Sequence, residues 1–477
     1  MPDSTVDQVS GTVTSAPSTR FQRIFCNQQF FKLWLAQVAS ATGDWIGFLA
    51  IAALAARIGA GNAGQAVGVV MIARVAPGFF LASLGGVLVD RWDRKKVMVV
   101  CDIGRAATLA LLPFIHTVWG LVLASLVMEC FTLMWSPAKE ASVPNLVPDE
   151  FLTNANSLSL AAAYGTFPVG AGLFALLAKV AEWLSSVPGL ESLKLNQEAT
   201  GFYFDMLTFL ISALLISRLV LPHLTRRASE NGDTKRIDWA QAYHEIKEGW
   251  GYIFQTPLIS AVLLGLCTAL LGGGMVVPIG PLFSRDVTGS GAAGFGVLTV
   301  GLGCGVAAGV AALSVVQNRV NRVRTFELSL GAGGVALIVA ASMSSLTLAT
   351  IGIAAVGICA GGVYVIGFTL LQENTTNDLR GRIFSAVYTL VRLSILVSFA
   401  VAGFLADGLG SLSDHLVHGK VGVKQAHYSL QGARLALWFA GLLVLGGFAG
   451  VVKAMRRARR AGSERGPGSA VADMDPA

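Results

Sequence analysis

Residues 64–96 read GQAVGVVMIARVAPGFFLASLGGVLVDRWDRKK, an apolar run that ends abruptly in a charged turn. An α-helix needs about 20 apolar residues to cross the hydrocarbon core of a bilayer, and 64–89 is long enough to do so. The charged residues that follow mark the point where the chain leaves the membrane. This stretch therefore predicts a membrane-spanning helix followed by a tight polar turn.

The rest of the chain repeats this pattern. Apolar runs of spanning length alternate with polar turns, and together with the first they number twelve. We expect the spans at residues 29–57, 64–89, 95–116, 119–140, 152–180, 200–221, 256–283, 292–317, 325–344, 346–372, 382–408 and 430–454. The predicted fold class is an all-α integral membrane protein with twelve transmembrane helices.

The composition agrees with a lipid environment. Of the 477 residues, 54% are hydrophobic and only 13% are charged, against about 25% charged in typical soluble domains. So few charges could not cover a water-facing surface, which excludes an ordinary cytoplasmic enzyme, a disordered scaffold and a nucleic-acid binder. The six cysteines are scattered singly, and the sequence contains no Gly-x-x-x-x-Gly-Lys-Ser/Thr loop. We therefore expect no disulfide framework, no zinc site or other metal, no cofactor and no direct use of ATP.

The net charge of +7 arises largely from loops that share one face. Lys and Arg concentrate in alternate connections, at residues 20–23, 91–96, 226–236, 319–324, 380–382 and 453–460. Positively charged loops stay on the cytoplasmic side of a membrane. Both termini are therefore expected in the cytoplasm and the protein in the cell membrane, with no cleaved signal peptide because residues 1–20 lack an apolar core.

An internal repeat divides the spans into two sets of six. A shift of 228 residues places Asp90-Arg91-Trp92-Asp93-Arg94 over Asn318-Arg319-Val320-Asn321-Arg322, and both segments follow the second span of their half. Transporters built from two parallel halves show weak similarity of this kind. The expected organisation is a cytoplasmic segment at 1–28, bundles at 29–221 and 255–454, a central cytoplasmic loop at 222–254, and a basic, then disordered tail at 455–477.

A second feature of the repeat concerns two isolated charges. A shift of 229 residues places Asp205 of span six over Arg434 of span twelve. Both are expected nearer to the outer surface, where they either form a gate pair or are solvated.

Residues 86–96, Gly-Val-Leu-Val-Asp-Arg-Trp-Asp-Arg-Lys-Lys, resemble the loop between the second and third helices of the major facilitator superfamily. The family pattern is Gly-x-Leu-Ala-Asp-Arg-x-Gly-Arg-Arg/Lys, and the match departs from it at Asp93, where the family has Gly. Other segments are similar to the branch of macrolide efflux and enterobactin export proteins: Gly43-Asp44, Arg74 to Pro77, Asp102-x-x-Arg105, Ser136-Pro137-Ala138-Lys139 running to Pro144-Asn145-Leu146-Val147, Asn154 to Ser157, and Arg380 to Ser385. The resemblance covers residues 20–455 and implies two pseudo-symmetric six-helix bundles, the major facilitator fold.

The resemblance also implies a conformational latch in this loop. Gly86 would let two helices approach closely, and Asp90 would accept hydrogen bonds from the amino end of a neighbouring helix. Arg91 and Arg94 would pair with acidic groups or lipid phosphates. In the family this contact holds the two halves together in the outward-facing state. The alternative is a basic loop that merely follows the charge rule.

Ionisable residues in the middle of the spans are the candidate sites for protons and substrate, because charge in lipid is costly. Gln37, Ser40 and Asp44 share one face of span one, since they are spaced by three and four residues. Glu129 lies in a similar polar stripe on span four. We expect Asp44 to be the coupling carboxylate, assisted by Glu129, although either acid could instead be a structural partner of a neighbouring helix.

Cations at similar depth are the expected partners of these acids. Arg392 of span eleven is interpreted as a counter-ion to Asp44 or Glu129, as a contact for a substrate anion, or as purely structural. Arg105 is the candidate partner of Glu129 if that acid is structural. The further charged candidates are Arg74 in span two and the pair Asp102 and Arg105 in span three.

The resemblance implies that spans one, four, seven and ten line a central cavity. Tyr364 and Phe368 of span ten would give that cavity an aromatic wall opposite the acidic one, which suits amphipathic and cationic substrates. Span five holds Pro168 among three glycines, and because Pro removes a backbone donor this helix can bend. Span five also resembles, in degraded form, the Gly-Pro-rich stretch in the fifth helix of drug antiporters. This resemblance is equally consistent with an antiporter and with a helix that merely packs closely on its neighbours.

The sequence therefore predicts a secondary active transporter that works by alternating access. The expected function is proton-coupled export of a small amphipathic compound, either a drug-like molecule or a siderophore, by a monomer that needs the lipid bilayer and no nucleic acid. The alternative is a lysophospholipid or metabolite carrier without proton coupling. A membrane enzyme would need a catalytic constellation and a receptor would need a sensory domain, and the sequence suggests neither.

Overall fold

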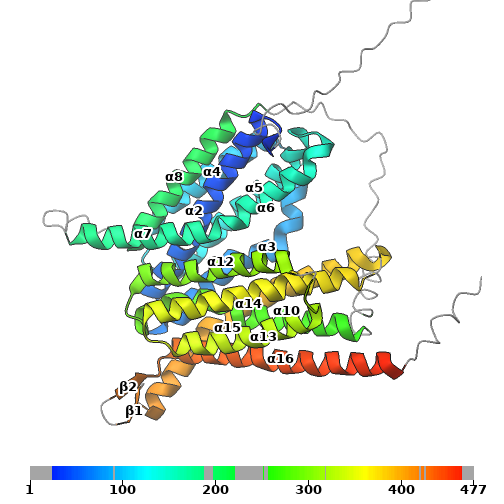
Figure 1. Ribbon diagram of the computed structural model, residues 1–477. Coiled ribbons are helices and arrows are strands. Elements are labelled where there is room, and N and C mark those ends of the chain that lie inside the picture. Colours follow the sequence, from blue (N-terminus) through cyan, green and yellow to red (C-terminus); the bar gives the residue numbers. More distant parts are fainter. Residues whose placement is uncertain are drawn as a thin grey trace, which may run out of the picture.

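The computed structural model describes residues 24–89, 92–186, 197–220, 251, 256–316, 319–375, 377–417, 420–423 and 426–464. Within these residues, 12 helices are long and apolar enough to cross a membrane. They form two bundles inclined to each other, the N-terminal one in blue to green and the C-terminal one in green to red (Figure 1). The predicted all-α membrane fold is confirmed, and the protein is a multi-pass membrane protein.

The N-terminal bundle contains the first six spans, the fifth of which is made of two helices. Its helices are α2 (Gln28–Ile58), α3 (Ala63–Val89), α4 (Arg94–Leu111), α5 (Val118–Ser142), α6 (Leu152–Gly165), α7 (Phe167–Ser185) and α8 (Gln197–Ser217). Helices α2 and α4 both pack on α8, and α5 packs on α3 and α4.

The C-terminal bundle repeats this plan, with the seventh span made of two helices. Its elements are α10 (Pro257–Gly274), α11 (Val276–Asp286), α12 (Gly291–Val316), α13 (Arg322–Ser342), α14 (Leu346–Glu373), α15 (Asn377–Val417), β1 (Lys420–Val423), β2 (Ala426–Ser429) and α16 (Gly432–Glu464). Strands β1 and β2 form an antiparallel hairpin between the last two spans. The sequence did not predict this hairpin.

Helix starts support the internal repeat. Asp93 caps α4 because its carboxylate accepts a hydrogen bond from the backbone N–H of Lys96, at 3.1 Å. Asn321 caps α13 in the same way through Arg324, also at 3.1 Å. These two caps are superposed by the 228-residue shift. The departure from the family pattern at Asp93 therefore has a local structural role.

Two spans break where the sequence places Gly and Pro. The fifth span is interrupted at Thr166, between α6 and α7, and Pro168 lies in the first turn of α7, where its missing N–H costs nothing. The seventh span is interrupted at Met275, after three consecutive glycines. The interruption of span five is the bend that its Gly-Pro content led us to expect, whereas the interruption of span seven was not predicted.

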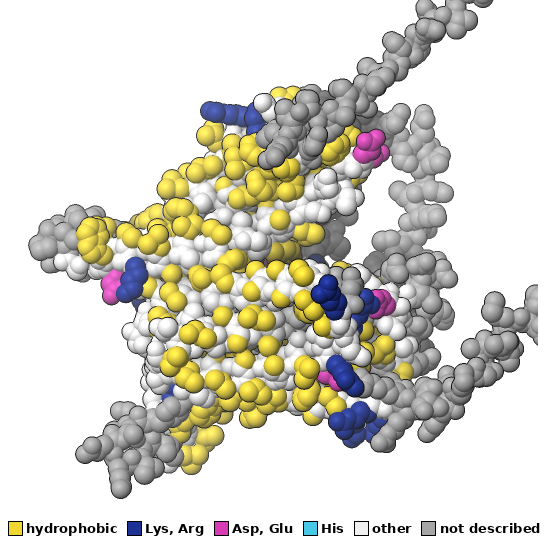
Figure 2. Space-filling model, viewed as in Figure 1, with side chains coloured by type: hydrophobic (Ala, Val, Ile, Leu, Met, Phe, Trp, Pro, Cys, Tyr) yellow, Lys and Arg dark blue, Asp and Glu magenta, His cyan; other side chains and the backbone are white. Residues whose placement is uncertain are grey.

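The bundles expose many apolar side chains on the face seen in Figure 2. Trp119 and Val315 are 76% and 80% exposed, and many Leu, Ile and Phe side chains on other helices are similarly open. An apolar surface of this extent would cause aggregation in water and is stable in contact with lipid tails. Lys, Arg, Asp and Glu gather toward the edges of the visible face.

The two bundles meet through α3 with α15 and through α7 with α12. Small residues make this contact close. A Cβ atom on Gly403 of α15 would overlap the carbonyl oxygen of Gly64 of α3, and one on Gly296 of α12 would lie 2.7 Å from Ala175 Cβ of α7. Gly therefore permits backbone-to-backbone packing between the halves.

A carboxylate adds to this contact. The two oxygens of Asp407 accept hydrogen bonds from the backbone N–H groups of Gly64, at 3.0 Å, and Gln65, at 2.8 Å. These donors lie at the start of α3, where backbone N–H groups lack helical partners and the helix dipole favours an anion. We call Gly64, Gln65, Gly403 and Asp407 the closed-end clasp.

Candidate functional site

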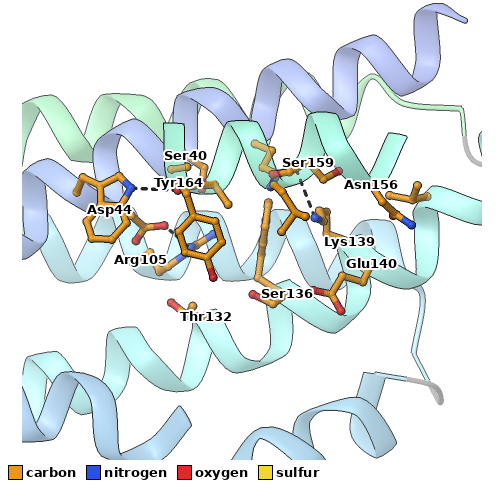
Figure 3. Close-up of a pocket in the computed structure, with 17 residues that line it drawn as sticks. Ser40, Asp44, Arg105, Thr132, Ser136, Lys139, Glu140, Asn156, Ser159 and Tyr164 are labelled. Carbon is orange, nitrogen blue, oxygen red and sulfur yellow. Dashed lines mark hydrogen bonds and ion pairs between the residues drawn. The ribbon is translucent and has the colours of Figure 1, made fainter. Parts of the chain in front are cut away.

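A cavity of about 620 Å³ opens on the side of the N-terminal bundle away from the closed-end clasp. Its walls come from α2, α4, α5 and α6 and from the turn after α5. The 17 lining residues are Gln37, Ser40, Ala41, Asp44, Trp45, Arg105, Thr132, Trp135, Ser136, Lys139, Glu140, Val143, Asn156, Ser159, Leu160, Ala163 and Tyr164. Asp44 and Arg105 lie toward one end of this cavity, and Lys139, Glu140 and Asn156 lie toward the other (Figure 3).

Asp44 lies at the inner end of the cavity between two guanidinium groups. Its Oδ1 atom is 3.3 Å from Arg74 Nη2, and its Oδ2 atom is 3.5 Å from Arg105 Nη1. The Asp44 side chain is 29% exposed, whereas those of Arg74 and Arg105 are 8% and 1% exposed. Asp44 is thus the point at which a buried charge network meets the cavity.

Arg105 joins Asp44 to a second acid. It forms an ion pair with Asp102 one turn earlier on α4, and the other oxygen of Asp102 accepts a hydrogen bond from Ser212 of α8 at 2.7 Å. The Arg105 guanidinium also lies over the Phe209 and Trp135 rings, 4.1 and 5.2 Å from their centroids. The structure therefore fixes Arg105 by charge and by aromatic contacts.

Arg74 joins Asp44 to Glu129. Its Nη1 atom is 3.7 Å from Glu129 Oε2. The candidate partners from the sequence were wrong at this point. Arg105 pairs with the two aspartates and not with Glu129, and Arg392 is exposed on α15 and forms no ion pair with Asp44 or Glu129. The N-terminal bundle supplies both cations itself, because α3 packs against α2 and α5, and α4 packs against α5.

Asp205 and Arg434 were predicted near the outer surface, as solvated residues or a gate pair, and both expectations were wrong. Both side chains are fully buried. Asp205 fits against α2 only because Gly43 and Gly47 lack side chains, and its Oδ1 atom accepts a hydrogen bond from Thr208 at 3.2 Å. Its Oδ2 atom has no hydrogen-bond partner among the described residues.

Arg434 is buried in the other bundle. It donates to the carbonyl oxygens of Ala341, at 3.1 Å, and Ser429, at 2.5 Å, and to the hydroxyl of Ser344, at 2.8 Å. It therefore satisfies backbone groups at the end of α13 and has no contact with Asp205.

The remaining predicted residues of span one lie at the other end of the cavity. Gln37 and Ser40 are both buried in its wall, and the Gln37 amide donates to the carbonyl oxygen of Ser159 at 3.0 Å. The Oε1 atom of Gln37 accepts from Lys139 Nζ at 3.4 Å. Lys139 was quoted from the sequence only as part of a family motif. Lys139 lies three residues after Ser136 and therefore on the same face of the helix as the polar stripe of span four. This spacing could have identified it as a cavity residue from the sequence.

The aromatic wall is in the C-terminal bundle. The rings of Tyr364 and Phe368 of α14 are tilted by 39° with centroids 4.6 Å apart, and Phe368 also contacts Phe384 and Tyr388 of α15. Tyr364 lies within electrostatic range of Tyr164, a cavity residue of the other bundle. Tyr364 therefore lies near one cavity residue, while all 17 residues that line the cavity come from the N-terminal bundle.

The predicted latch is described only in part. Asp90 and Arg91, and the surroundings of Gly86 within α3, lie outside the described residues. Arg94 donates to the carbonyl oxygen of Ala141 at the end of α5, at 2.7 Å. This contact stays within the N-terminal bundle.

A twelve-span helical protein with two bundles and a polar cavity in the wall of one of them has the architecture of a membrane transporter. The family model of the Major Facilitator Superfamily matches residues 33–399, and the chain belongs to this family. The resemblance seen in the sequence is thereby confirmed. The protein is a transporter and not an enzyme.

Relatives within the family extend over most of the chain. The chain is 26% identical to the uncharacterized transporter YfiS of Bacillus subtilis over 87% of its own length and 95% of that protein. It is 23% identical to macrolide efflux protein A of Streptococcus pyogenes, over 68% of its length and 76% of that protein. The crystal structure of a bacterial homolog of the human lysosomal transporter Spinster, inward-facing and unoccupied, shares the fold at 14% identity, with a TM-score of 0.65 over 90% of this chain and 97% of that one.

Proposed function

We propose that this protein exports a small amphipathic compound across the cell membrane in exchange for protons, by alternating access. Export is favoured by the similarity to macrolide efflux protein A. An amphipathic substrate is favoured by a cavity that combines charged and hydroxyl side chains with Trp45, Trp135 and Tyr164. The aromatic cluster of the opposite bundle adds apolar surface.

Alternating access is supported by the different state of the two ends of the molecule. The closed-end clasp holds the bundles together at one end, and Arg285 of α11 adds a hydrogen bond to the Ala56 carbonyl oxygen of α2, at 3.1 Å. The cavity opens toward the other end, where Lys and Arg residues surround the starts of α4 and α13. The positive-inside rule favours a cytoplasmic location for this end, which supports an inward-open state in the proposed cycle.

Proton coupling is supported by the position of Asp44, and this is the observation that carries the proposal. Each guanidinium has one carboxylate of its own, Glu129 for Arg74 and Asp102 for Arg105, and the two share Asp44. If Asp44 takes up a proton from the cavity, its ion pairs with Arg74 and Arg105 are lost. The pairs Arg74–Glu129 and Arg105–Asp102 remain. A coupling group must be charged in one conformation and neutral in another, and Asp44 can change charge without leaving either arginine unpaired.

The proposed test begins with a substrate. A strain that overproduces the protein is screened for resistance against a panel of amphipathic compounds, and the compound that shows the largest effect is used in inside-out vesicles. We then measure its uptake against an imposed pH gradient for wild type, for Asp44→Asn and for Glu129→Gln. Glu182→Gln is the matched control, because Glu182 is an exposed acid of α7 whose one ion-pair partner among the described residues is Lys179.

We expect Asp44→Asn to abolish gradient-driven uptake while exchange of the compound remains measurable, and Glu129→Gln to give a milder loss. Asn keeps the size of Asp and lacks its proton chemistry. If Asp44→Asn transports uphill at the wild-type rate with the same gradient dependence, the coupling role is wrong and a carrier without proton coupling is favoured. Aggregation on size-exclusion chromatography would instead identify Asp44 as a structural acid.

A further inference from the structure

Lys139 is a buried cation at the open end of the cavity. Its side chain belongs to the last turn of α5, is 8% exposed and lines the cavity wall. Its one hydrogen bond within the described part of the chain is to Gln37 Oε1, and at 3.4 Å this bond is long. The ammonium group is thus largely removed from water with little to replace its hydration.

The other charges of the cavity do not compensate for Lys139. Asp44 is held by Arg74 and Arg105 at the inner end, and Arg105 is further paired with Asp102. Glu140, the next residue on α5, lies within electrostatic range of Lys139, but it is exposed and forms no ion pair with it among the described residues. Burying an ammonium group without a partner is costly, and such groups are normally paired.

We propose that Lys139 forms the anion subsite of the transport cavity, and that the substrate is an amphipathic anion whose acidic group binds its ammonium. The proposal rests on the proposed transport function and specifies the substrate class. Asn156, an amide on the facing helix α6, lines the same end of the cavity and adds a neutral donor. The sequence suggested amphipathic and cationic compounds because it took the Asp44 and Glu129 side of the cavity as an acidic wall, whereas in the structure both acids are paired with arginines.

The aromatic residues lie at the right distance for the rest of such a molecule. Gln37 connects Lys139 to α6, because it accepts a hydrogen bond from Lys139 and donates one to the carbonyl oxygen of Ser159. Ser159 is therefore the residue of α6 that lies at the same depth in the cavity as Lys139. Tyr164 follows five residues later on the same helix, which is about 7.5 Å further along its axis. An acidic group at Lys139 would therefore place an apolar body of ring size beside Tyr164 and Trp45, opposite Tyr364.

Two fluorescent probes that differ only in charge test this assignment. Dansylglycine carries a carboxylate, and dansylglycinamide carries an uncharged amide in its place. Binding of each is measured in nanodiscs of phosphatidylcholine by energy transfer from tryptophan, since Trp45 and Trp135 both line the cavity. The variants are Lys139→Gln, Lys139→Arg and, as a matched control, Lys179→Gln, which changes an exposed lysine of α7 outside the cavity.

We expect wild type to bind dansylglycine more tightly than the amide. Lys139→Gln should weaken dansylglycine binding about tenfold, as for a lost charge-assisted hydrogen bond, and leave the amide unchanged. Lys139→Arg should retain the preference for the anion, and Lys179→Gln should behave as wild type. An equal loss of both probes in Lys139→Gln, no change in either, or a wild type without preference for the anion would each overturn the proposal.

The acidic group could come from a soluble compound or from a lipid. Replacing part of the phosphatidylcholine with phosphatidylglycerol distinguishes the two. Loss of dansylglycine binding in these nanodiscs supports the anion subsite and assigns it to a lipid headgroup, and undiminished binding supports it for a soluble anion. These measurements are made at equilibrium without a pH gradient, so they do not depend on proton coupling, and failure of gradient-driven export would leave them unaffected.

Discussion

Substitution of Asp407 by Asn should open the closed end of the transporter. In the structure both carboxylate oxygens accept backbone N–H groups at the start of α3, at 3.0 and 2.8 Å. Asn retains one acceptor oxygen and turns an NH₂ group toward the second N–H, so one charge-assisted bond becomes a donor–donor contact. A hydrogen bond to a charged group contributes about 1.5–3 kcal/mol. We take about 2 kcal/mol, since Asp407 is only partly buried, which corresponds to a roughly thirty-fold change in the ratio of the two states.

The assay is the distance between the bundles at this end. Spin labels are placed at Asn62, in the turn before α3, and at Leu412 on α15, both exposed, in a background without native cysteines. Pulsed dipolar spectroscopy should show the short distance as the main population in wild type and a longer distance gaining in Asp407→Asn. The matched control is Asp414→Asn, which removes an exposed carboxylate seven residues further along the same helix.

Two results would refute this reasoning. An unchanged distance distribution in Asp407→Asn would mean that the clasp contributes little to the closed end and that apolar packing alone holds it. An equal shift in Asp414→Asn would mean that the effect comes from the overall charge of α15 and not from the bonds to Gly64 and Gln65.

Three further outcomes can be checked independently. Gly403→Ala should open the same end, because its Cβ would overlap the Gly64 carbonyl oxygen, whereas Gly408→Ala has open space around it and should not; the same spin labels report both. Arg434→Ala should destabilise the C-terminal bundle by about 2 kcal/mol, because the buried carbonyl oxygen of Ala341 and two less buried acceptors lose their donor; thermal unfolding should show a clear fall in Tm, absent in the exposed control Arg456→Ala. Lys235→Cys should react with an impermeant maleimide only after cells are permeabilised, because the 222–254 loop is expected in the cytoplasm, and rapid labelling in intact cells would contradict that topology.

The number of spans, their division into two sets of six and the family could all be derived from the sequence. Membrane insertion depends on the summed hydropathy of about 20 consecutive residues, which is a local and additive quantity. The repeat was visible for a related reason. Asp93 and Asn321 are helix caps, whose effect is decided within four residues of chain, so the sequence similarity between the halves persists at these positions.

The partners of the charged residues were decided by the tertiary structure alone. Asp44, Arg74 and Glu129 lie on three different helices, and whether they meet depends on how each helix is rotated and inclined in its bundle. The sequence placed Asp44 in the cavity wall but offered Arg392 as one candidate counter-ion for Asp44 or Glu129, because depth in the membrane does not reveal which helices are neighbours. Asp205 was misplaced for the same reason, since its burial depends on two glycines of α2 that remove the side chains from its path. The role proposed for Lys139 also depends on the tertiary structure. The acids near the cavity are already paired with arginines, so Lys139 is left with only a long hydrogen bond to Gln37 among the described residues and can bind a ligand.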